Sequence, residues 1–360
     1  MSVSLDSLRA ELSALVAGGD AWAAQADDAV AGVLPRVVVA PSSEDEVAAV
    51  LAYANRERLA VIPRGGGTHL SLGFPPRRAD LVLDLTRLNQ VLDYVPHDQT
   101  VTAQAGMRFT ALQSALAQAG QWLALDPLLA PEATIGGVVA TNATGARRLR
   151  YGGVRDQIIG VRVATADGVL AKGGGKVVKN VAGYDLPKLF TGSLGTLGLI
   201  VSATFRVYPL TPQSRTVVLR ANEPQPLGEV ALVTIASTLV PTIIDILTPS
   251  GGSSGYMLAI RFESGVEEAV SEQVQELLRV AGPLGEHGLV FSDDEDAAFW
   301  READAMLEPR VAPAGQESVV LKASVVMDAV APWLIELQGE IQQRGLSEVV
   351  RAHASHGIVY

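Results

Sequence analysis

The sequence predicts an α+β protein, with a helical segment over residues 1–34, one domain over 35–210 and a smaller one over 211–360. Three observations support this prediction. The 360 residues leave room for two domains of ordinary size, each with its own core. A strand–helix–strand pattern near the start leads into three successive glycines, Gly65 to Gly67. Pro209 and Pro212 then separate this region from a second series of alternating strands and helices.

The first domain is predicted from short-range patterns. Leucines recur at helical spacing over residues 5–15 and predict a first helix. Ser43 followed by Glu46 forms a capping box for a helix that lies between strands at 36–40 and 59–62. The remaining pattern predicts strands at 81–85 and 100–105, a helix at 109–119, a hairpin with strands at 158–165 and 169–170, and a strand ending at Tyr208.

The second domain is predicted to form one sheet with helices. Strands are expected at 216–219, 242–247, 256–262, 319–324 and 349–360, and helices at 266–280, 295–306 and 330–344.

Composition excludes several classes of function. Hydrophobic residues make up 48% of the chain and charged residues 19%, which is typical of a globular protein. The net charge of −11 argues against a nucleic-acid-binding surface, which needs clustered lysine and arginine. The chain has no cysteine, which excludes disulfides, thiol catalysis and iron–sulfur clusters held by this chain. No apolar run reaches the ~20 residues of a membrane span, and the first residues lack the layout of a signal peptide.

The glycine-rich stretch from Pro63 to Gly73 is the strongest candidate for a binding site. Glycine allows positive φ angles and lets a ligand approach the backbone closely. Successive N–H groups in such a turn form a concavity that binds anionic oxygens, and Arg64 is expected to add a positive charge beside it. A diphosphate is therefore the expected ligand, and a plain flexible turn is the alternative.

Two further glycine-rich segments follow in the same domain. Thr134 is expected to cap a helix whose first turn contains Gly136 and Gly137. Residues 189–200 have a glycine at every third position before a strand. Neither the nucleotide P-loop nor the Rossmann fingerprint is present, because Val177 replaces the Ser or Thr after Lys176 and Leu70 replaces the last glycine.

Taken in order, these segments resemble the FAD-binding domain of the vanillyl-alcohol-oxidase and p-cresol-methylhydroxylase (PCMH-type) flavoprotein family, from about Pro35 to Pro209. The string Lys-Asn-Val-Ala-Gly-Tyr-Asp-Leu at 179–186 is most similar to the smaller flavin subunit, the E subunit, of bacterial glycolate oxidase. The resemblance implies a two-lobed FAD-binding domain followed by an α+β cap domain that faces substrate or partner.

The resemblance also implies which residues bind FAD. The first loop would wrap the pyrophosphate, the middle segments would line the flavin and its ribityl chain, and the last loop would meet the adenine. The expected cofactor-binding residues are Arg64, Gly65, Gly66, Gly67, Thr68, His69, Pro127, Thr134, Gly137, Thr141, Asn142, Gly145, Leu149, Tyr151, Gly152, Gly195, Gly198 and Ile200.

Non-covalent FAD is expected. Some family members attach FAD to a histidine that directly follows the Gly-Gly pair, a position held here by Thr68. His69 comes one residue later, and its side chain is expected to point elsewhere. No metal is expected, because the segment from His353 to Ile358 lacks the Gly-Asn-Leu-His-like string of larger family members.

The resemblance implies a flavin-carrying subunit of a complex that oxidises glycolate or another D-2-hydroxy acid. Its partners would be a larger flavin subunit and an iron–sulfur subunit, in the cytoplasm or at a membrane that those partners contact. The first alternative is a self-sufficient FAD-dependent dehydrogenase of glycolate or D-lactate. The second is a non-redox scaffold that keeps the fold.

In the self-sufficient enzyme, an arginine would hold the substrate carboxylate and a histidine would accept the hydroxyl proton. The candidates are Arg261, Arg351, His353 and His356, each of which also suits a purely structural role. His353 and His356 are expected on opposite faces of one strand, because they lie three residues apart.

Overall fold

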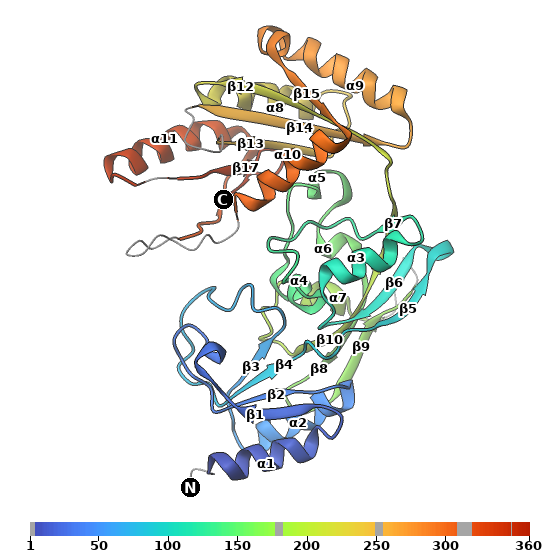
Figure 1. Cartoon of the computed structure of the whole chain (residues 1–360), viewed down its shortest axis with the longest axis vertical. Helices are drawn as coiled ribbons and strands as arrows, with labels where there is room; N and C mark the ends of the chain where they lie inside the picture. The colour runs from blue at the N-terminus through green and yellow to red at the C-terminus, as the bar shows by residue number, and fades with distance from the viewer. Residues whose placement is uncertain (1–3, 177–182, 249–254, 308–318, 347) are drawn as a thin grey trace. The chain divides into compact units, whose positions relative to one another are not determined.

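The computed structural model describes residues 4–176, 183–248, 255–307, 319–346 and 348–360. It divides into two compact units, and the segment Gly145–Gly152 belongs to the second of them. Unit 1 comprises residues up to Thr144 and Gly153–Leu210, and unit 2 comprises Gly145–Gly152 and Thr211–Tyr360. Both units combine helices and sheets, so the predicted α+β class is confirmed (Figure 1). The predicted domain limits at residues 34 and 210 stay a prediction.

The first lobe of unit 1 is a four-stranded sheet in the order β1-β2-β4-β3, with helices α1 and α2 (Figure 1). Its elements are α1 (Leu5–Leu15), β1 (Asp20–Ala23), β2 (Val37–Ala40), α2 (Glu44–Arg56), β3 (Val61–Arg64) and β4 (Leu81–Asp84). Strands β2, β4 and β3 are parallel, and β1 is antiparallel to β2. The valines of β2 are fully buried, as expected for a parallel strand. Because parallel strands end at one edge, β3 delivers the glycine-rich loop beside the end of β4.

The second lobe of unit 1 is a five-stranded antiparallel sheet in the order β5-β6-β10-β8-β9, with a separate pair, β7 and β11. Its elements are β5 (Val91–Val95), β6 (Thr100–Gln104), α3 (Phe109–Ala117), β7 (Gln121–Trp122), α4 (Ile135–Thr141), α6 (Val154–Gln157), β8 (Ile158–Ala164), β9 (Leu170–Gly174), α7 (Leu186–Phe190), β10 (Leu199–Arg206) and β11 (Tyr208–Pro209). The predicted hairpin is confirmed as β8 and β9, with Gly168 at φ 84° in its turn. One hydrophobic core extends through both lobes.

Unit 2 is built on a seven-stranded antiparallel sheet in the order β15-β12-β14-β13-β17-β18-β16. Its elements are α5 (Arg148–Tyr151), β12 (Gln213–Ala221), α8 (Pro224–Ala236), β13 (Ile243–Leu247), β14 (Tyr256–Ser264), α9 (Glu267–Val280), β15 (Leu289–Ser292), α10 (Asp293–Ala305), β16 (Ala323–Ser324), α11 (Val330–Gln343), β17 (Arg351–His353) and β18 (Ile358–Val359). Helices α8, α9 and α11 pack on one face over a large apolar core. Helix α10 packs on the other face, where Trp300 and Ala303 form a smaller core with the strands.

Several predicted strands have other bounds in the structure. The strand after α2 begins at Val61 rather than Leu59, because Arg58 adopts a left-handed φ of 54° and the Leu59 N–H still bonds to the helix at Ala54. Pro63 lies inside this strand, which an edge strand tolerates. Of the strand predicted at 319–324, only Ala323–Ser324 forms.

The predicted final strand at 349–360 is also wrong. The segment forms two short strands, β17 and β18, around a turn. Gly357 adopts a φ of 69° in this turn, and the backbone N–H groups of His356 and Gly357 both donate to the His353 carbonyl.

In the part of the chain that the structure describes, no helix is long and apolar enough to cross a membrane. Residues 179–182 of the glycolate-oxidase-like string lie outside the described residues.

Candidate functional site: a glycine-lined cavity

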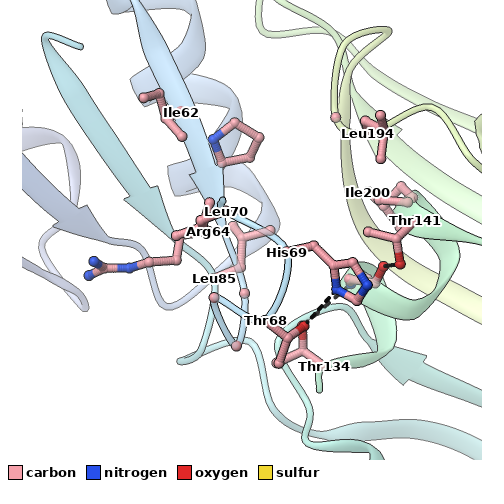
Figure 2. A pocket seen from close by; sticks show the side chains of 18 of the residues that line it. Ile62, Arg64, Thr68, His69, Leu70, Leu85, Thr134, Thr141, Leu194 and Ile200 are labelled. Atoms are coloured by element: carbon pink, nitrogen blue, oxygen red, sulfur yellow. Dashed lines mark hydrogen bonds between the residues drawn. The ribbon is translucent and has the colours of Figure 1, made fainter. Parts of the chain in front are cut away.

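A cavity of about 460 Å³ lies within unit 1 where its three glycine-rich segments meet. Figure 2 shows the loop after β3, the start of α4 and the loop before β10 around it. Of the predicted cofactor-binding residues, those that line it are Arg64, Gly65, Gly66, Gly67, Thr68, His69, Thr134, Gly137, Thr141, Gly195, Gly198 and Ile200. The three segments are far apart in the sequence, and the fold brings them to one place.

The loop after β3 offers unused hydrogen-bond donors. The backbone N–H groups of Gly65, Gly66, Gly67 and Thr68 have no acceptor among the described residues. Gly67 adopts a φ of 78°, a conformation in which consecutive N–H groups turn toward one side. Such a loop suits an anionic oxygen ligand.

The same loop packs tightly on the segment that starts α4. A Cβ atom at Gly66 would lie 1.7 Å from the Glu132 carbonyl oxygen, and one at Gly65 would lie 2.2 Å from the Thr134 Oγ. Thr134 also caps α4, because its hydroxyl accepts the Gly137 N–H at 3.4 Å. Glycine is therefore required at these two positions for the cavity walls to meet.

Arg64 does not provide the positive charge that the sequence suggested. Its guanidinium donates to Asp28 and Asp84 at 2.9 Å each, and in Figure 2 it extends away from the side where His69 and Thr134 lie. Burial by itself lowers the pKa of Arg64, but the two carboxylates outweigh this effect and raise it. The guanidinium is thus fixed in an ion-pair network, and any contact with an anion falls to the backbone.

His69 is one of the residues that line the cavity, and the expectation that its side chain points away from the flavin attachment position stays a prediction. Its ring Nδ1 lies 3.0 Å from the Thr68 hydroxyl (Figure 2). The cavity wall at this point is therefore a hydroxyl–imidazole pair.

The chemistry of the lining fits a dinucleotide cofactor. None of the described lining residues is Asp or Glu, in a chain with a net charge of −11. Besides Arg64, whose guanidinium is paired with Asp28 and Asp84, the side-chain polar groups are the hydroxyls of Thr68, Thr134, Thr141 and Thr196 and the His69 ring. The remaining lining is mostly glycine and apolar side chains, which suits flat heterocyclic rings at either end of a diphosphate.

Six predicted cofactor-binding residues do not line this cavity. Pro127 and Asn142 belong to unit 1, where Asn142 ends α4 in a left-handed conformation with φ 50°. The other four, Gly145, Leu149, Tyr151 and Gly152, belong to unit 2. Their predicted contacts with the cofactor stay a prediction.

Sequence reasoning missed the apolar part of the lining, which includes Val30, Leu70, Leu72, Phe74, Leu85, Ala105 and Leu194. Leu72 and Phe74 are exposed, Phe74 almost completely at 99%. Exposed apolar residues directly after a glycine-rich loop are the signal that could have indicated them.

The four catalytic candidates all lie in unit 2, and both arginines are held by carboxylates. Arg261 pairs with Asp296 at 2.6 Å and with Glu263 at 3.1 Å. Arg351 pairs with Asp245 at 2.8 Å and with Asp304 at 2.6 Å. These contacts favour structural roles for the two arginines.

The two histidines lie close together. His353 is buried and its Nδ1 lies 2.8 Å from Asp245. The ring centroids of His353 and His356 are 5.2 Å apart, so the expected placement on opposite faces is wrong. The turn after β17 causes this, since it folds His356 back over His353. No cluster of three potential metal ligands occurs among the described residues.

Known proteins that are similar to this chain include an FAD-binding domain family and 2-hydroxy acid oxidoreductases. Residues 35–174 match a family model described as an FAD binding domain. The chain is 41% identical over 185 residues to a D-2-hydroxyglutarate dehydrogenase of Xanthomonas citri pv. viticola, covering 51% of this chain and 39% of that protein. It is 34% identical over 214 residues to the glycolate oxidase subunit GlcD of Bacillus subtilis, covering 59% of this chain and 46% of that one.

A solved structure of an alkyldihydroxyacetonephosphate synthase superposes with a TM-score of 0.73 over 91% of this chain and 70% of that one. The two sequences are 19% identical, which shows a shared fold. The chain spans less than half the length of the two relatives described above.

Proposed function

We propose that this chain, whose residues 35–174 match an FAD binding domain, is a PCMH-type flavoprotein with FAD as its cofactor, and that it takes part in the oxidation of a D-2-hydroxy acid such as glycolate. The observation that supports this most is the cavity with unused N–H donors and no acidic lining, inside the region that matches the FAD-binding model. Bound FAD supplies the two-electron acceptor for such an oxidation. The residues of unit 1 would hold it: the loop after β3 at the diphosphate, and the apolar lining at the rings.

We propose further that the chain works as the flavin-carrying subunit of a larger complex, similar to the E subunit of bacterial glycolate oxidase. A complex that passes electrons onward through iron–sulfur clusters needs another chain for them, because this one has no cysteine. The partners would be a larger flavin subunit and an iron–sulfur subunit. Such partners could also bring it to a membrane surface.

A self-sufficient dehydrogenase is the second candidate. The relative with 41% identity is named as a dehydrogenase rather than as a subunit. Against it, both arginines that could hold a substrate carboxylate are already paired with acidic residues.

One measurement distinguishes the subunit of a complex from the self-sufficient dehydrogenase. The purified chain, loaded with FAD, is mixed anaerobically with glycolate or D-lactate, and the flavin absorbance is followed. A stable yellow protein that is bleached only after the partner subunits are added supports the subunit. Bleaching by the isolated chain supports the self-sufficient enzyme, and a colourless protein that takes up no FAD would end both.

Acid precipitation tests the expected non-covalent attachment. FAD should remain in the supernatant, because Thr68 holds the position of the attachment histidine. The variant His69→Ala should release FAD in the same way. Flavin that stays in the wild-type pellet but not in the His69→Ala pellet would show a covalent bond to His69.

A further inference from the structure

The loop after β3 lies next to an excess of negative charge. Arg64, which leads into the loop, is paired with the two carboxylates of Asp28 and Asp84, so these three side chains together carry a net negative charge. A dinucleotide brings one more negative charge on each of its phosphates, which such surroundings repel. The backbone N–H groups of the loop offset part of this repulsion, and a nearby cation without a carboxylate of its own would offset more.

Arg108 is a cation of this kind. It is an exposed residue of unit 1, directly before α3. Its guanidinium donates to the backbone carbonyl of Glu132, and within the described ranges no carboxylate forms an ion pair with it. A carbonyl oxygen accepts the hydrogen bond but carries no full charge, so Arg108 remains an uncompensated cation.

The fold places this guanidinium against the glycine loop. Arg108 pairs with Thr134 through an isolated antiparallel bridge, which fixes its backbone beside the segment that starts α4. A Cβ atom at Gly66 would lie 2.8 Å from the Arg108 Nη1 and 1.7 Å from the Glu132 carbonyl oxygen, the acceptor of that same Nη1. The guanidinium, the carbonyl and Gly66 therefore meet at one point of the loop whose N–H groups are unused.

We propose that Arg108 supplies the positive charge for the cofactor's diphosphate, the role that Arg64 cannot fill. Arg108 is not one of the residues that line the cavity, so its charge acts across the loop backbone rather than by direct contact. The position of the charge follows from contacts within unit 1. The choice of a diphosphate as the anion rests on the proposed function, because it assumes that the cavity holds FAD.

The test is a titration of the FAD-free chain with FAD, followed by flavin fluorescence, over a series of sodium chloride concentrations. In Arg108→Gln the Kd for FAD should rise about three- to tenfold at ~0.01 M salt, where the Debye length of about 30 Å leaves the charge unscreened. At about 1 M salt, with a Debye length of about 3 Å, the variant should match the wild type. Arg108→Lys keeps the charge and should stay within about twofold of the wild type throughout.

Two further variants serve as controls. Arg9→Gln changes the net charge by the same amount on the exposed side of α1, and it should leave the Kd unchanged. Glu132→Gln keeps the carbonyl that Arg108 binds and removes an exposed carboxylate of the same residue, so it should not raise the Kd.

The dependence on salt separates charge from packing. A loss of affinity in Arg108→Gln that is equal at all salt concentrations, or an equal loss in Arg108→Lys, would show that Arg108 acts by packing and would overturn the proposal. Wild-type affinity of Arg108→Gln at low salt would also overturn it and leave the proposed function standing. A wild-type chain that takes up no FAD would end the proposed function and this proposal with it.

Discussion

At the scale of single residues, the cavity depends on the missing side chains of two glycines. The loop after β3 and the segment before α4 approach so closely that a Cβ atom at Gly66 would overlap the Glu132 carbonyl. The contact leaves the loop's own N–H groups free for a ligand. Glycine at this position therefore serves backbone packing as well as ligand access.

The variant Gly66→Ala should lose most of its FAD, because the loop must move away from residue 132 to admit the methyl group. The measurement is the flavin-to-protein absorbance ratio after gel filtration, with circular dichroism to check the fold. The matched control is Gly339→Ala in α11, where a Cβ meets no atom within 4 Å. A full FAD content in Gly66→Ala would contradict this role of the loop.

Asp245 forms the buried pairs with Arg351 and His353 in the sheet of unit 2. Its side chain is fully buried between Arg351 and His353. Burial by itself raises the pKa of Asp245, but the charges and hydrogen bonds of His353 and Arg351 outweigh it and lower the pKa. The carboxylate thus remains charged at neutral pH.

The substitution Asp245→Asn should lower the unfolding free energy by about 3–5 kcal/mol, because the buried guanidinium of Arg351 then lacks its main counter-ion. Asp304→Asn removes the other, largely exposed carboxylate on the same Arg351 and should cost under ~1 kcal/mol. Urea denaturation of both variants measures the difference. Equal losses would show that burial of the Asp245 pair does not matter.

At the scale of elements, the start of α2 is held to α1 by one glutamate. Ser43 caps the helix by accepting the Glu46 N–H at 3.2 Å, as its sequence pattern predicts. The Glu46 carboxylate accepts the Ser42 N–H at 2.7 Å and the Gly18 N–H at 2.8 Å. Glu46 therefore links the helix cap to the turn that follows α1.

Glu46→Ala should lower the unfolding free energy by about 1–2 kcal/mol, through the loss of hydrogen bonds to two backbone N–H groups. Glu272→Ala on the exposed side of α9 serves as the control and should change it by less than ~0.5 kcal/mol. Thermal melts of the two variants test this. An unchanged melting temperature for Glu46→Ala would show that water replaces the carboxylate at no cost.

At the scale of the whole molecule, FAD should affect the two units differently. Ligand binding to the folded state alone stabilises it, by about 2.7 kcal/mol at a concentration of 100 Kd. Because the cavity lies in unit 1, hydrogen exchange should slow most over residues 62–76, 134–141 and 194–200. Mass spectrometry of peptides with and without FAD measures this.

Hydrogen exchange in the segment 145–152 tests a second expectation, the predicted cofactor contacts of that segment. It belongs to unit 2, and the predicted cofactor contacts of Leu149, Tyr151 and Gly152 lie on it. Slower exchange there would support those contacts. Uniform protection across 211–360, as strong as that over 62–76, would contradict the assignment of the cofactor to the cavity.

Local patterns in the sequence by themselves determined several elements, the fold class and the candidate site. The capping pair at Ser43 and Glu46, the Asp167-Gly168 turn and the three glycine-rich segments each depend on residues a few positions apart. Their order along the chain predicted the α+β class and the FAD-binding family.

Only the tertiary structure decided which acidic residues pair with the buried arginines. Arg64 pairs with Asp28 and Asp84, residues 36 and 20 positions away, and Arg351 pairs with Asp245 across 106 positions. The turn that brings His356 onto His353 depends on pairing within the last ten residues, which a reading of one continuous strand missed. Backbone preference is set by neighbours in sequence, whereas the partner of a buried charge is set by which strands lie side by side.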